Sequence, residues 1–373
     1  MIIVADENIP FIKEALSELG ETRLFAGRSI THDKVIDADA LLIRSVTRVN
    51  SLLLENTKVR FVGSATTGID HVDVKWLESK GIFFINAAGA NSRSVVDYVI
   101  AAVFFWLVKM KKLLKDLSVG VIGCGRIGSQ VANIFQRLGC DVKKNDPPKE
   151  NAKEKGPWVS LNEILKCDVV TVHTPLVKTG PYPTYHLCNK DFFEKFSGGL
   201  YINTSRGAVC DNKSLLAAFE KKGFQFVLDV WENEPEPDYN LIKNAFIATP
   251  HIAGYSLNGR LRATMILCDA LFSFFGKSFN KDSIKFPSGF SLALPNNNMT
   301  LEENIYFFIK NVYDIESDDK RFREAAEKSF SGWFDLLRKN YPERREFSDF
   351  IIPYNCQIEN FLDILGFKKG DYH

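Results

Sequence analysis

The chain has 373 residues, of which 45% are hydrophobic and 25% charged, the values of an ordinary globular protein. It carries 47 basic and 46 acidic residues, a net charge of +1 that gives no support to a nucleic-acid partner or an anionic membrane surface. Its 7 cysteines include no Cys-x-x-Cys pair, which argues against a zinc ribbon and against a disulfide scaffold, and we predict no metal site.

No segment predicts a signal peptide or a membrane span. Asp6 and Glu7 stand where the apolar core of a signal peptide would begin. The longest apolar stretch, Val95–Val108, is interrupted by Asp97 and is shorter than the roughly 20 residues that a bilayer requires. We therefore expect a soluble, cytoplasmic protein with no membrane partner.

The first hundred residues alternate short apolar strands with helices. A helix is predicted at Phe11–Leu19, and strands are predicted at Ile2–Ala5, Ala40–Ile43, Arg60–Gly63 and Gly81–Asn86. This alternation predicts a mostly parallel sheet with helices on both faces. A long helix follows, from about Ser94 to Lys112.

A second and stronger alternation begins at Ser118. Its predicted strands are Val119–Gly123, Val142–Asp146, Val169–Thr174, Leu200–Asn203, Val227–Val230 and Phe246–Ala248, which is a doubly wound pattern. A helix is predicted over residues 258–275 and a linker over residues 277–299. The remaining tail is rich in Phe and charge, with helices expected at about 301–311 and 319–338.

A glycine-rich loop stands between the first strand and the first helix of this second pattern. Gly123-Cys124-Gly125-Arg126-Ile127-Gly128 is a G-x-G-x-x-G motif, weak by itself but strengthened by its position. Such glycines let the backbone approach a pyrophosphate at a helix N-terminus. Asp146, at the end of the next strand, can accept hydrogen bonds from a ribose 2′-hydroxyl, so the pattern predicts NAD rather than NADP.

Three later strands of the same sheet are followed by residues suited to alcohol oxidation. Arg206, Glu234 and His251 each come after a strand, and the carboxyl ends of parallel strands share one edge. Histidine suits the removal of a hydroxyl proton, and a carboxylate on its second nitrogen would orient the ring. Arginine can hold a substrate carboxylate with two hydrogen bonds. We therefore predict hydride transfer from a hydroxy acid.

Two loops of the first sheet predict a phosphate site. Arg44 and Ser45 follow one strand, and Thr66 and Thr67 follow the next. Hydroxyls, loop N–H groups and an arginine at strand ends suit a dianion. The alternative is that Arg44 is a structural salt-bridge partner.

The chain resembles the D-isomer-specific 2-hydroxyacid dehydrogenases. The matching stretches are VGVIGCGRIG, HTPL, INTSRGAVCDN, LDVWENEP and TPHIAG. More particular stretches, among them HIAGYSLNGR and LRKNYPERREF, are similar to a subgroup with a tail that most relatives lack. That similarity implies NAD-dependent oxidation of 4-phospho-D-erythronate to (R)-3-hydroxy-2-oxo-4-phosphooxybutanoate, a step of pyridoxal 5′-phosphate (vitamin B6) biosynthesis.

The resemblance also implies a fold and a set of site residues. The expected fold is α/β, with two Rossmann-like doubly wound lobes and a small C-terminal α+β dimerisation domain. The substrate lobe would span 1–93 and be completed by the returning helix 257–280. The NAD lobe would span 94–256, and the C-terminal domain through which a homodimer forms would span 286–373. Arg206, Glu234 and His251 match catalytic positions. The matching NAD-contacting positions are Asp146, Thr174, Asp229 and Gly254, and the matching substrate-contacting positions are Ser45, Thr66 and Tyr255.

Several other polar residues are expected to be structural. His71 is expected to stabilise a loop, His173 to lie on the cofactor side, and the run Glu343–Glu346 to be a solvated or interface charge cluster. Two alternative functions stay open. One is another D-2-hydroxyacid dehydrogenase, such as one for 3-phosphoglycerate, and the other is a non-enzymatic, NAD-sensing corepressor.

Overall fold

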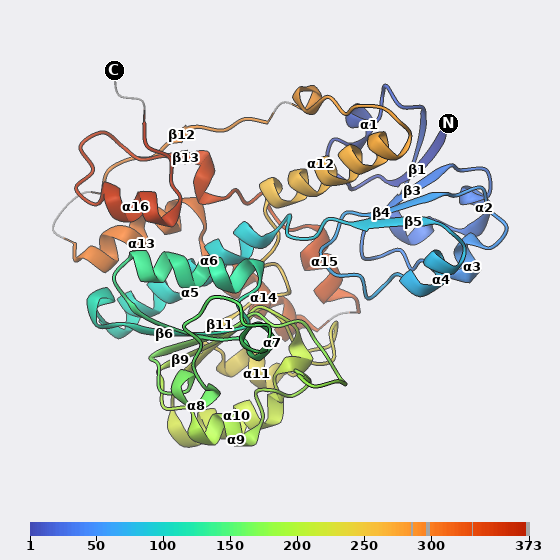
Figure 1. Cartoon of the computed structure of the whole chain (residues 1–373). Helices are drawn as coiled ribbons and strands as arrows, with labels where there is room; N and C mark the ends of the chain where they lie inside the picture. The colour runs from blue at the N-terminus through green and yellow to red at the C-terminus, as the bar shows by residue number, and fades with distance from the viewer. Residues whose placement is uncertain (285, 296–298, 330, 371–373) are drawn as a thin grey trace. The chain divides into compact units, whose positions relative to one another are not determined.

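The computed structural model describes residues 1–284, 286–295, 299–329 and 331–370 (Figure 1). The chain forms two compact units, Met1–Ser92 with Tyr255–Pro287 and Arg93–Gly254 with Ser288–His373. Each unit contains an all-parallel sheet flanked by helices. The predicted α/β class with two Rossmann-like sheets is confirmed.

The first unit has a five-stranded sheet in the order β2-β1-β3-β4-β5, the order of a flavodoxin-like doubly wound sheet. The strands are β1 (Ile2–Asp6), β2 (Glu21–Phe25), β3 (Ala40–Ile43), β4 (Phe61–Ser64) and β5 (Phe83–Asn86). The helices are α1 (Ile12–Ala15), α2 (His32–Val35), α3 (Ser51–Leu54), α4 (Val74–Ser79) and α12 (Leu257–Phe274), with short 3-10 helices at Gly27–Ser29 and Lys281–Ser283.

One strand of this sheet was not predicted from the sequence. β2 carries Glu21 and Arg23, and none of its residues is fully buried. It lies at the sheet edge and pairs only with β1, so it needs little apolar surface and gives a weak sequence signal. By contrast, every residue of β3 is buried, as expected of a parallel strand covered on both faces.

The second unit has a six-stranded sheet in the order β11-β10-β9-β8-β6-β7. Its strands are β6 (Ser118–Ile122), β7 (Asp141–Asn145), β8 (Val169–Val172), β9 (Leu200–Asn203), β10 (Gln225–Leu228) and β11 (Ile247–Ala248). Its helices are α5 (Ser92–Met110), α6 (Arg126–Arg137), α7 (Pro147–Asn151), α8 (Leu161–Ile164), α9 (Lys190–Lys195), α10 (Asn212–Lys222) and α11 (Tyr239–Asn244), with 3-10 turns at Leu114–Asp116 and Gly207–Val209. Because β6 lies between β7 and β8, the strand order reverses there, and a ligand crevice is expected at that point.

The tail packs within the second unit. It contains α13 (Leu301–Val312), α14 (Ile315–Lys328), α15 (Trp333–Lys339) and α16 (Glu359–Leu365), a short β12–β13 pair (Phe290–Ser291 and Phe350–Ile351) and a 3-10 turn at Phe347–Asp349. The single helix predicted over 319–338 is wrong. The chain takes left-handed backbone angles at Ser329 (φ 41°) and Gly332 (φ 75°), which end α14 and start α15 separately.

The aromatic side chains of the tail are mostly buried in its own unit. Phe322 contacts Trp231 of the sheet region, with ring centroids 5.4 Å apart, and Phe308, Phe334 and Phe347 are at most 1% exposed. A surplus of aromatic residues therefore does not by itself require a second copy of the chain. The dimerisation domain at 286–373 stays a prediction, and residues 296–298, 330 and 371–373 of it lie outside the described part.

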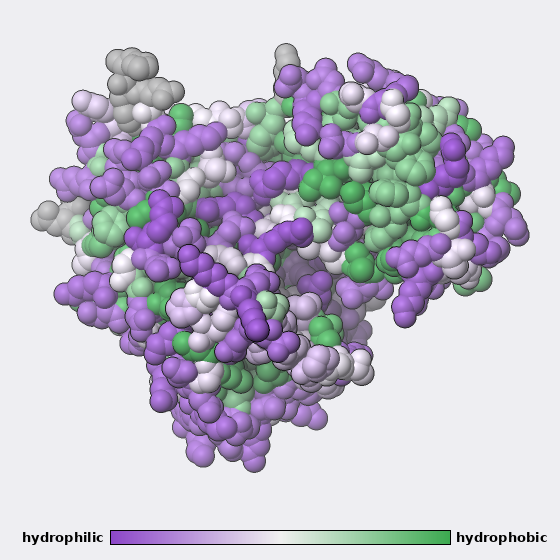
Figure 2. Space-filling model, viewed as in Figure 1, coloured by the Kyte–Doolittle hydropathy of each residue, from purple (hydrophilic) through white to green (hydrophobic). Residues whose placement is uncertain are grey.

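The surface of the molecule is mixed in character. Figure 2 shows hydrophilic surface over α8–α10 and larger hydrophobic areas over the first unit. Within the described residues, no helix is both long enough and apolar enough to cross a membrane.

Candidate active site

The glycine-rich loop connects β6 to α6 as the sequence predicted. Gly123 has φ +82°, and a Cβ there would lie 2.8 Å from Thr174 Cγ2 and 2.9 Å from the backbone carbon of His173. A Cβ on Gly128 would lie 2.0 Å from the carbonyl oxygen of Gly123. These two glycines are thus required for the turn and for the close packing of α6 on β6.

The remaining features of this loop fit a bound dinucleotide. A Cβ on Gly125 would meet no described atom within 4 Å, so open space lies beside the loop at the N-terminus of α6. Arg126 and Ile127 begin that helix, whose free N–H groups suit a pyrophosphate. The hydroxyl oxygen of Thr174 is buried and has no hydrogen-bond partner among the described residues. A ligand at this loop would supply the missing partner.

Asp146 lies directly beside the glycine-rich loop. Its Oδ2 accepts a 2.7 Å hydrogen bond from the Cys124 N–H, and its Oδ1 accepts from the Lys149 N–H at the start of α7. The carboxylate therefore ties the end of β7 to the loop after β6. This is where an acid that binds the ribose hydroxyls of NAD is expected.

We predict that Asp146→Asn narrows the preference for NAD over NADP. The amide oxygen can still accept the Cys124 hydrogen bond that ties β7 to the loop, although the Lys149 N–H loses its acceptor, and the negative charge that repels a 2′-phosphate is lost. Titration of the Asp146→Asn and unmodified proteins with NAD and NADP measures the change. Equal affinity of the unmodified protein for both cofactors would contradict the assignment.

His251 and Glu234 form a hydrogen-bonded pair. His251 Nδ1 lies 2.8 Å from Glu234 Oε2, and Glu234 Oε1 accepts from the Trp231 N–H at 2.9 Å. Burial raises the pKa of Glu234, but the hydrogen bond and charge of His251, together with the Trp231 N–H, outweigh it and hold this pKa below its usual value. Glu234 is therefore ionised at neutral pH and fixes the tautomer that leaves His251 Nε2 as a base.

The neighbouring acid, Glu232, has a different partner. Its Oε1 lies 2.7 Å from His186 Nε2, and its Oε2 accepts from the Asn212 N–H at 3.0 Å. Glu232 therefore pairs with His186, whereas Glu234 pairs with His251. The sequence did not predict the His186–Glu232 pair, because the two residues lie far apart in the chain.

Asp229 holds the loop that carries His251. Its Oδ1 accepts from the Thr249 hydroxyl at 2.7 Å and the Ile252 N–H at 2.8 Å, and its Oδ2 accepts from the Ala253 N–H at 2.9 Å. Asp229 is 1% exposed, and burial raises its pKa. Gly254 ends this loop. The predicted contacts of Asp229 and Gly254 with NAD stay predictions.

Arg206 follows β9 and lies next to the loop that contains Glu234. A Cβ on Gly207 would be 1.9 Å from the Trp231 carbonyl oxygen, so the two loops touch through their backbones. Arg206 is partly exposed, and its Nη1 donates to the Ser205 carbonyl oxygen at 2.8 Å. Asn203 Nδ2 donates to the Arg206 carbonyl oxygen and steadies the turn. The structure thus places Arg206, Glu234 and His251 on neighbouring loops at one edge of the sheet.

His173 directly follows β8 in the chain, and its imidazole is neutral. Its Nε2 is 3.0 Å from the Thr171 hydroxyl and its Nδ1 is 3.3 Å from the Thr204 hydroxyl. Burial lowers the pKa of His173 to about 3. Its backbone packs against Gly123 of the glycine-rich loop, and its position on the cofactor side stays a prediction.

The first unit carries the predicted phosphate-binding residues. Arg44 Nε donates to Asp6 Oδ2 at 3.0 Å, and Asp6 is fully buried at the end of β1. Because that bond uses one of five guanidinium N–H donors, Arg44 has a structural partner and can still bind an anion. Ser45 is exposed at the end of β3.

Thr66 follows β4, the neighbour of β3. Its hydroxyl contacts the Ser64 hydroxyl at 2.7 Å and donates to the Gly68 carbonyl oxygen at 2.9 Å. His71 Nε2 lies 3.0 Å from the Ser64 hydroxyl, consistent with its expected role in stabilising this loop. Tyr255 begins the returning segment of the first unit and precedes α12.

Two residues of the charged run Glu343–Glu346 are buried, whereas solvent exposure was one of the two expectations for this run. Arg344 is 4% exposed and Glu346 1% exposed, so these two residues are not solvated. The sequence gives no local signal of this burial, because the partners of both side chains come from distant segments.

Comparison with known proteins agrees with this geometry. Residues 106–253 match the family model described as D-isomer specific 2-hydroxyacid dehydrogenase, NAD binding domain, and residues 292–366 match a domain of unknown function. The chain is 42% identical to the erythronate-4-phosphate dehydrogenase of Tolumonas auensis over 99% of both chains. It is 39% identical to the enzyme of that name from Escherichia coli O127:H6, over 99% of this chain and 98% of the relative. The chain belongs to the erythronate-4-phosphate dehydrogenase family.

Solved structures of NAD-dependent dehydrogenases share the fold of this erythronate-4-phosphate dehydrogenase family member. D-lactate dehydrogenase from Aquifex aeolicus, complexed with NAD and lactic acid, matches with TM-score 0.60 and 26% identity over 74% of this chain and 96% of its own. The 3-phosphoglycerate dehydrogenase of Entamoeba histolytica, at 24% identity and TM-score 0.62 over 74% of this chain and 95% of its own, shares the fold alone. The protein is an NAD-dependent 2-hydroxyacid dehydrogenase.

Proposed function

We propose that the protein oxidises 4-phospho-D-erythronate to (R)-3-hydroxy-2-oxo-4-phosphooxybutanoate, in the biosynthesis of pyridoxal 5′-phosphate. The observation that carries this is the 2.8 Å His251–Glu234 bond in the same unit as the glycine-rich NAD loop. Relatives named for this activity match the chain over nearly its whole length. The substrate and the site roles below go beyond what that likeness establishes.

The proposed mechanism assigns a role to each catalytic side chain. Bound NAD supplies the acceptor for the hydride that leaves the 2-carbon of the hydroxy acid. His251 Nε2 accepts the hydroxyl proton, and Glu234 stabilises the resulting imidazolium. Arg206 holds the substrate carboxylate and orients the carbon–hydrogen bond.

The proposed binding residues come from the two units. For NAD they are Gly123, Gly125, Arg126, Ile127, Gly128, Asp146, Thr174, Asp229 and Gly254, and for the substrate they are Arg44, Ser45, Thr66 and Tyr255. The orphaned hydroxyl of Thr174 and the open space at Gly125 support the first set. The hydroxyls and the arginine that follow the adjacent strands β3 and β4 support the second.

The activity is tested by following NADH absorbance with purified protein. We expect turnover of 4-phospho-D-erythronate and much slower turnover of D-3-phosphoglycerate and unphosphorylated D-erythronate. Faster turnover of D-3-phosphoglycerate would favour the alternative dehydrogenase. NAD binding with no turnover of any of the three acids would favour the corepressor alternative.

We predict that Arg44→Lys raises KM for the phosphorylated acid with little change in kcat. Lysine keeps the charge next to the buried Asp6 but lacks the fork that grips a phosphate with paired hydrogen bonds. Arg48→Lys, at an exposed position of the same loop, serves as the matched control. If the Arg44→Lys variant changes KM for D-erythronate as much as for its phosphorylated form, Arg44 has no role in phosphate binding.

We further propose that the protein is a cytoplasmic homodimer that associates through residues 286–373. The support is the resemblance in LRKNYPERREF and the exposed apolar side chains of the tail, Leu336 at 44% and Tyr354 at 63%. Sedimentation of the full chain should give twice 42.2 kDa, and Leu336→Asp with Tyr354→Asp should lower that mass. A monomer over the micromolar range would contradict the proposal.

A further inference from the structure

A buried arginine of the tail contacts the loop that carries His251. Arg344 Nη2 donates to the Ala253 carbonyl oxygen at 3.0 Å and also to the Ser94 carbonyl oxygen on α5. Its Nη1 donates to the Ile252 carbonyl oxygen at 3.4 Å. One guanidinium thus links the two residues after His251 to the first turn of α5.

The same two loop residues are also held through their N–H groups. Ile252 and Ala253 donate these to the buried carboxylate of Asp229. Their N–H groups therefore meet a buried anion and their carbonyl groups a buried cation. Hydrogen bonds to charged groups are stronger than those between neutral groups, so this loop is strongly constrained.

The constraint matters because the backbone conformation of His251 costs free energy. His251 has φ +58°, in the left-handed region that is uncommon for residues other than glycine. Such a conformation persists only where the surrounding structure determines it by several contacts. The Asp229 and Arg344 bonds supply those contacts at the next two residues.

Arg344 is itself held in place by its neighbours. Its guanidinium lies 4.0 Å from the centre of the Tyr313 ring. Glu346 accepts a 2.8 Å hydrogen bond from the Ser94 hydroxyl, and the Phe347 N–H donates to Asp97 at 3.1 Å. The buried carboxylates of Asp97 and Asp318 also interact electrostatically with the guanidinium of Arg344.

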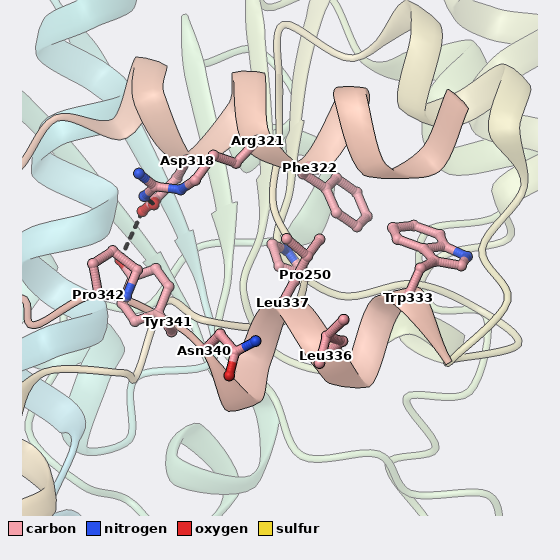
Figure 3. A pocket seen from close by; sticks show the side chains of 10 residues that line it. All are labelled: Pro250, Asp318, Arg321, Phe322, Trp333, Leu336, Leu337, Asn340, Tyr341 and Pro342. Carbon is pink, nitrogen blue, oxygen red and sulfur yellow. Dashed lines mark hydrogen bonds and ion pairs between the residues drawn. The ribbon is translucent and has the colours of Figure 1, made fainter. Parts of the chain in front are cut away.

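Other parts of the tail contact the chain just before His251. Asp319 of α14 accepts a 2.7 Å hydrogen bond from the Ala248 N–H of β11. Pro250 lines a cavity of about 160 Å³ together with Phe322, Leu337 and Tyr341 (Figure 3). The tail therefore contacts this segment on both sides of His251.

We propose that Arg344 is a positioning residue for His251, and that the tail thereby takes part in catalysis within its own chain. This rests on the proposed role of His251 as the base. It gives the domain of unknown function at residues 292–366 a task separate from association between copies. The guanidinium holds the loop carbonyls so that the imidazole meets the substrate hydroxyl in the productive orientation.

The test compares Arg344→Ala with Arg323→Ala. Arg323 is a second tail arginine that pairs with Asp319 and donates to the carbonyl oxygens of Lys243 and Ala245, away from the loop after His251. We expect Arg344→Ala to lower kcat by about 10²-fold and to change KM for NAD less than about threefold, since a small displacement of a catalytic group has this effect. Arg323→Ala should keep kcat close to that of the unmodified protein.

Two further readouts separate positioning from loss of folding. Hydrogen exchange measured by mass spectrometry should be faster over residues 249–254 in Arg344→Ala only. Millimolar guanidinium chloride should restore part of the kcat of Arg344→Ala, because it can occupy the vacated site, and should not affect Arg323→Ala. If Arg344→Ala does not fold, Arg344→Lys, which keeps the buried charge, is measured in the same way and is expected to show the same changes to a smaller extent.

The proposal is overturned if the Arg344 variants keep the kcat and the exchange rates of the unmodified protein. It is also overturned if Arg323→Ala reproduces both effects, because the tail would then act only by general docking. Failure of the unmodified protein to oxidise 4-phospho-D-erythronate would instead contradict the proposed function. The exchange measurement would still decide whether Arg344 holds the loop.

Discussion

Replacing His251 with asparagine is expected to lower kcat by about 10²–10⁴-fold, the usual contribution of a positioned acid–base group. Asparagine suits this test because it adopts left-handed backbone angles readily, as position 251 requires. The loop should therefore keep its conformation while the base is lost. Steady-state kinetics measure kcat, and fluorescence titration should give a Kd for NAD close to that of the unmodified protein.

The pair partner offers a second measurement of the same site. Glu234→Gln retains an acceptor for His251 but removes the charge that stabilises the imidazolium, so turnover should fall. It should also lower the stability at neutral pH more than at acid pH. The pKa of Glu234 is lower in the folded protein than its usual value, so its ionised form stabilises the fold above pH 4.5 or so, and this contribution is lost as pH falls further.

Urea unfolding of Glu234→Gln and of the unmodified protein at pH 7 and pH 3 measures how much the Glu234 charge contributes to stability at each pH. The gap in unfolding free energy should be present at pH 7 and should shrink at pH 3. If either His251→Asn or Glu234→Gln had the same kcat as the unmodified protein, the proposed catalytic pair would be contradicted.

Replacing Arg206 with methionine is expected to cost about 2–5 kcal/mol of transition-state binding, or roughly 30- to 5000-fold in kcat/KM. Methionine keeps an unbranched apolar side chain in place of the aliphatic part of arginine but leaves the substrate carboxylate without its paired donors. Arg206→Lys restores the charge and not the fork, so it should recover only part of the loss. Rate measurements with 4-phospho-D-erythronate test both variants.

The control for Arg206 is the binding of NAD, which neither substitution should change. A loss of NAD affinity equal to the loss in kcat/KM would mean that the turn after β9 had collapsed. If Arg206→Met had full activity, the substrate carboxylate would have to bind another residue.

The strands that are buried on both faces were predictable from the sequence, because short, mostly apolar runs such as Ala40–Ile43 and Leu200–Asn203 are typical of parallel strands covered by helices on both sides. The glycine-rich loop was predictable too, since its glycines, the preceding strand and Asp146 occur in a fixed order. Polar and interrupted elements were less predictable. The edge strand β2 was missed, and the break between α14 and α15 depends on left-handed turns that the helical spacing of apolar residues did not reveal.

The sequence by itself determined the fold class, the cofactor and the candidate residues Arg206, Glu234 and His251. The reason is that the residues that follow parallel strands all lie at the same edge of the sheet. Only the tertiary structure decided that Glu232 pairs with His186, and that Arg44 contacts a buried carboxylate. It also decided that Arg344, which reads as surface charge in the sequence, lies buried against the loop of His251. The physical reason is that burial and hydrogen-bond partners across long sequence separations are set by packing, which local composition does not encode.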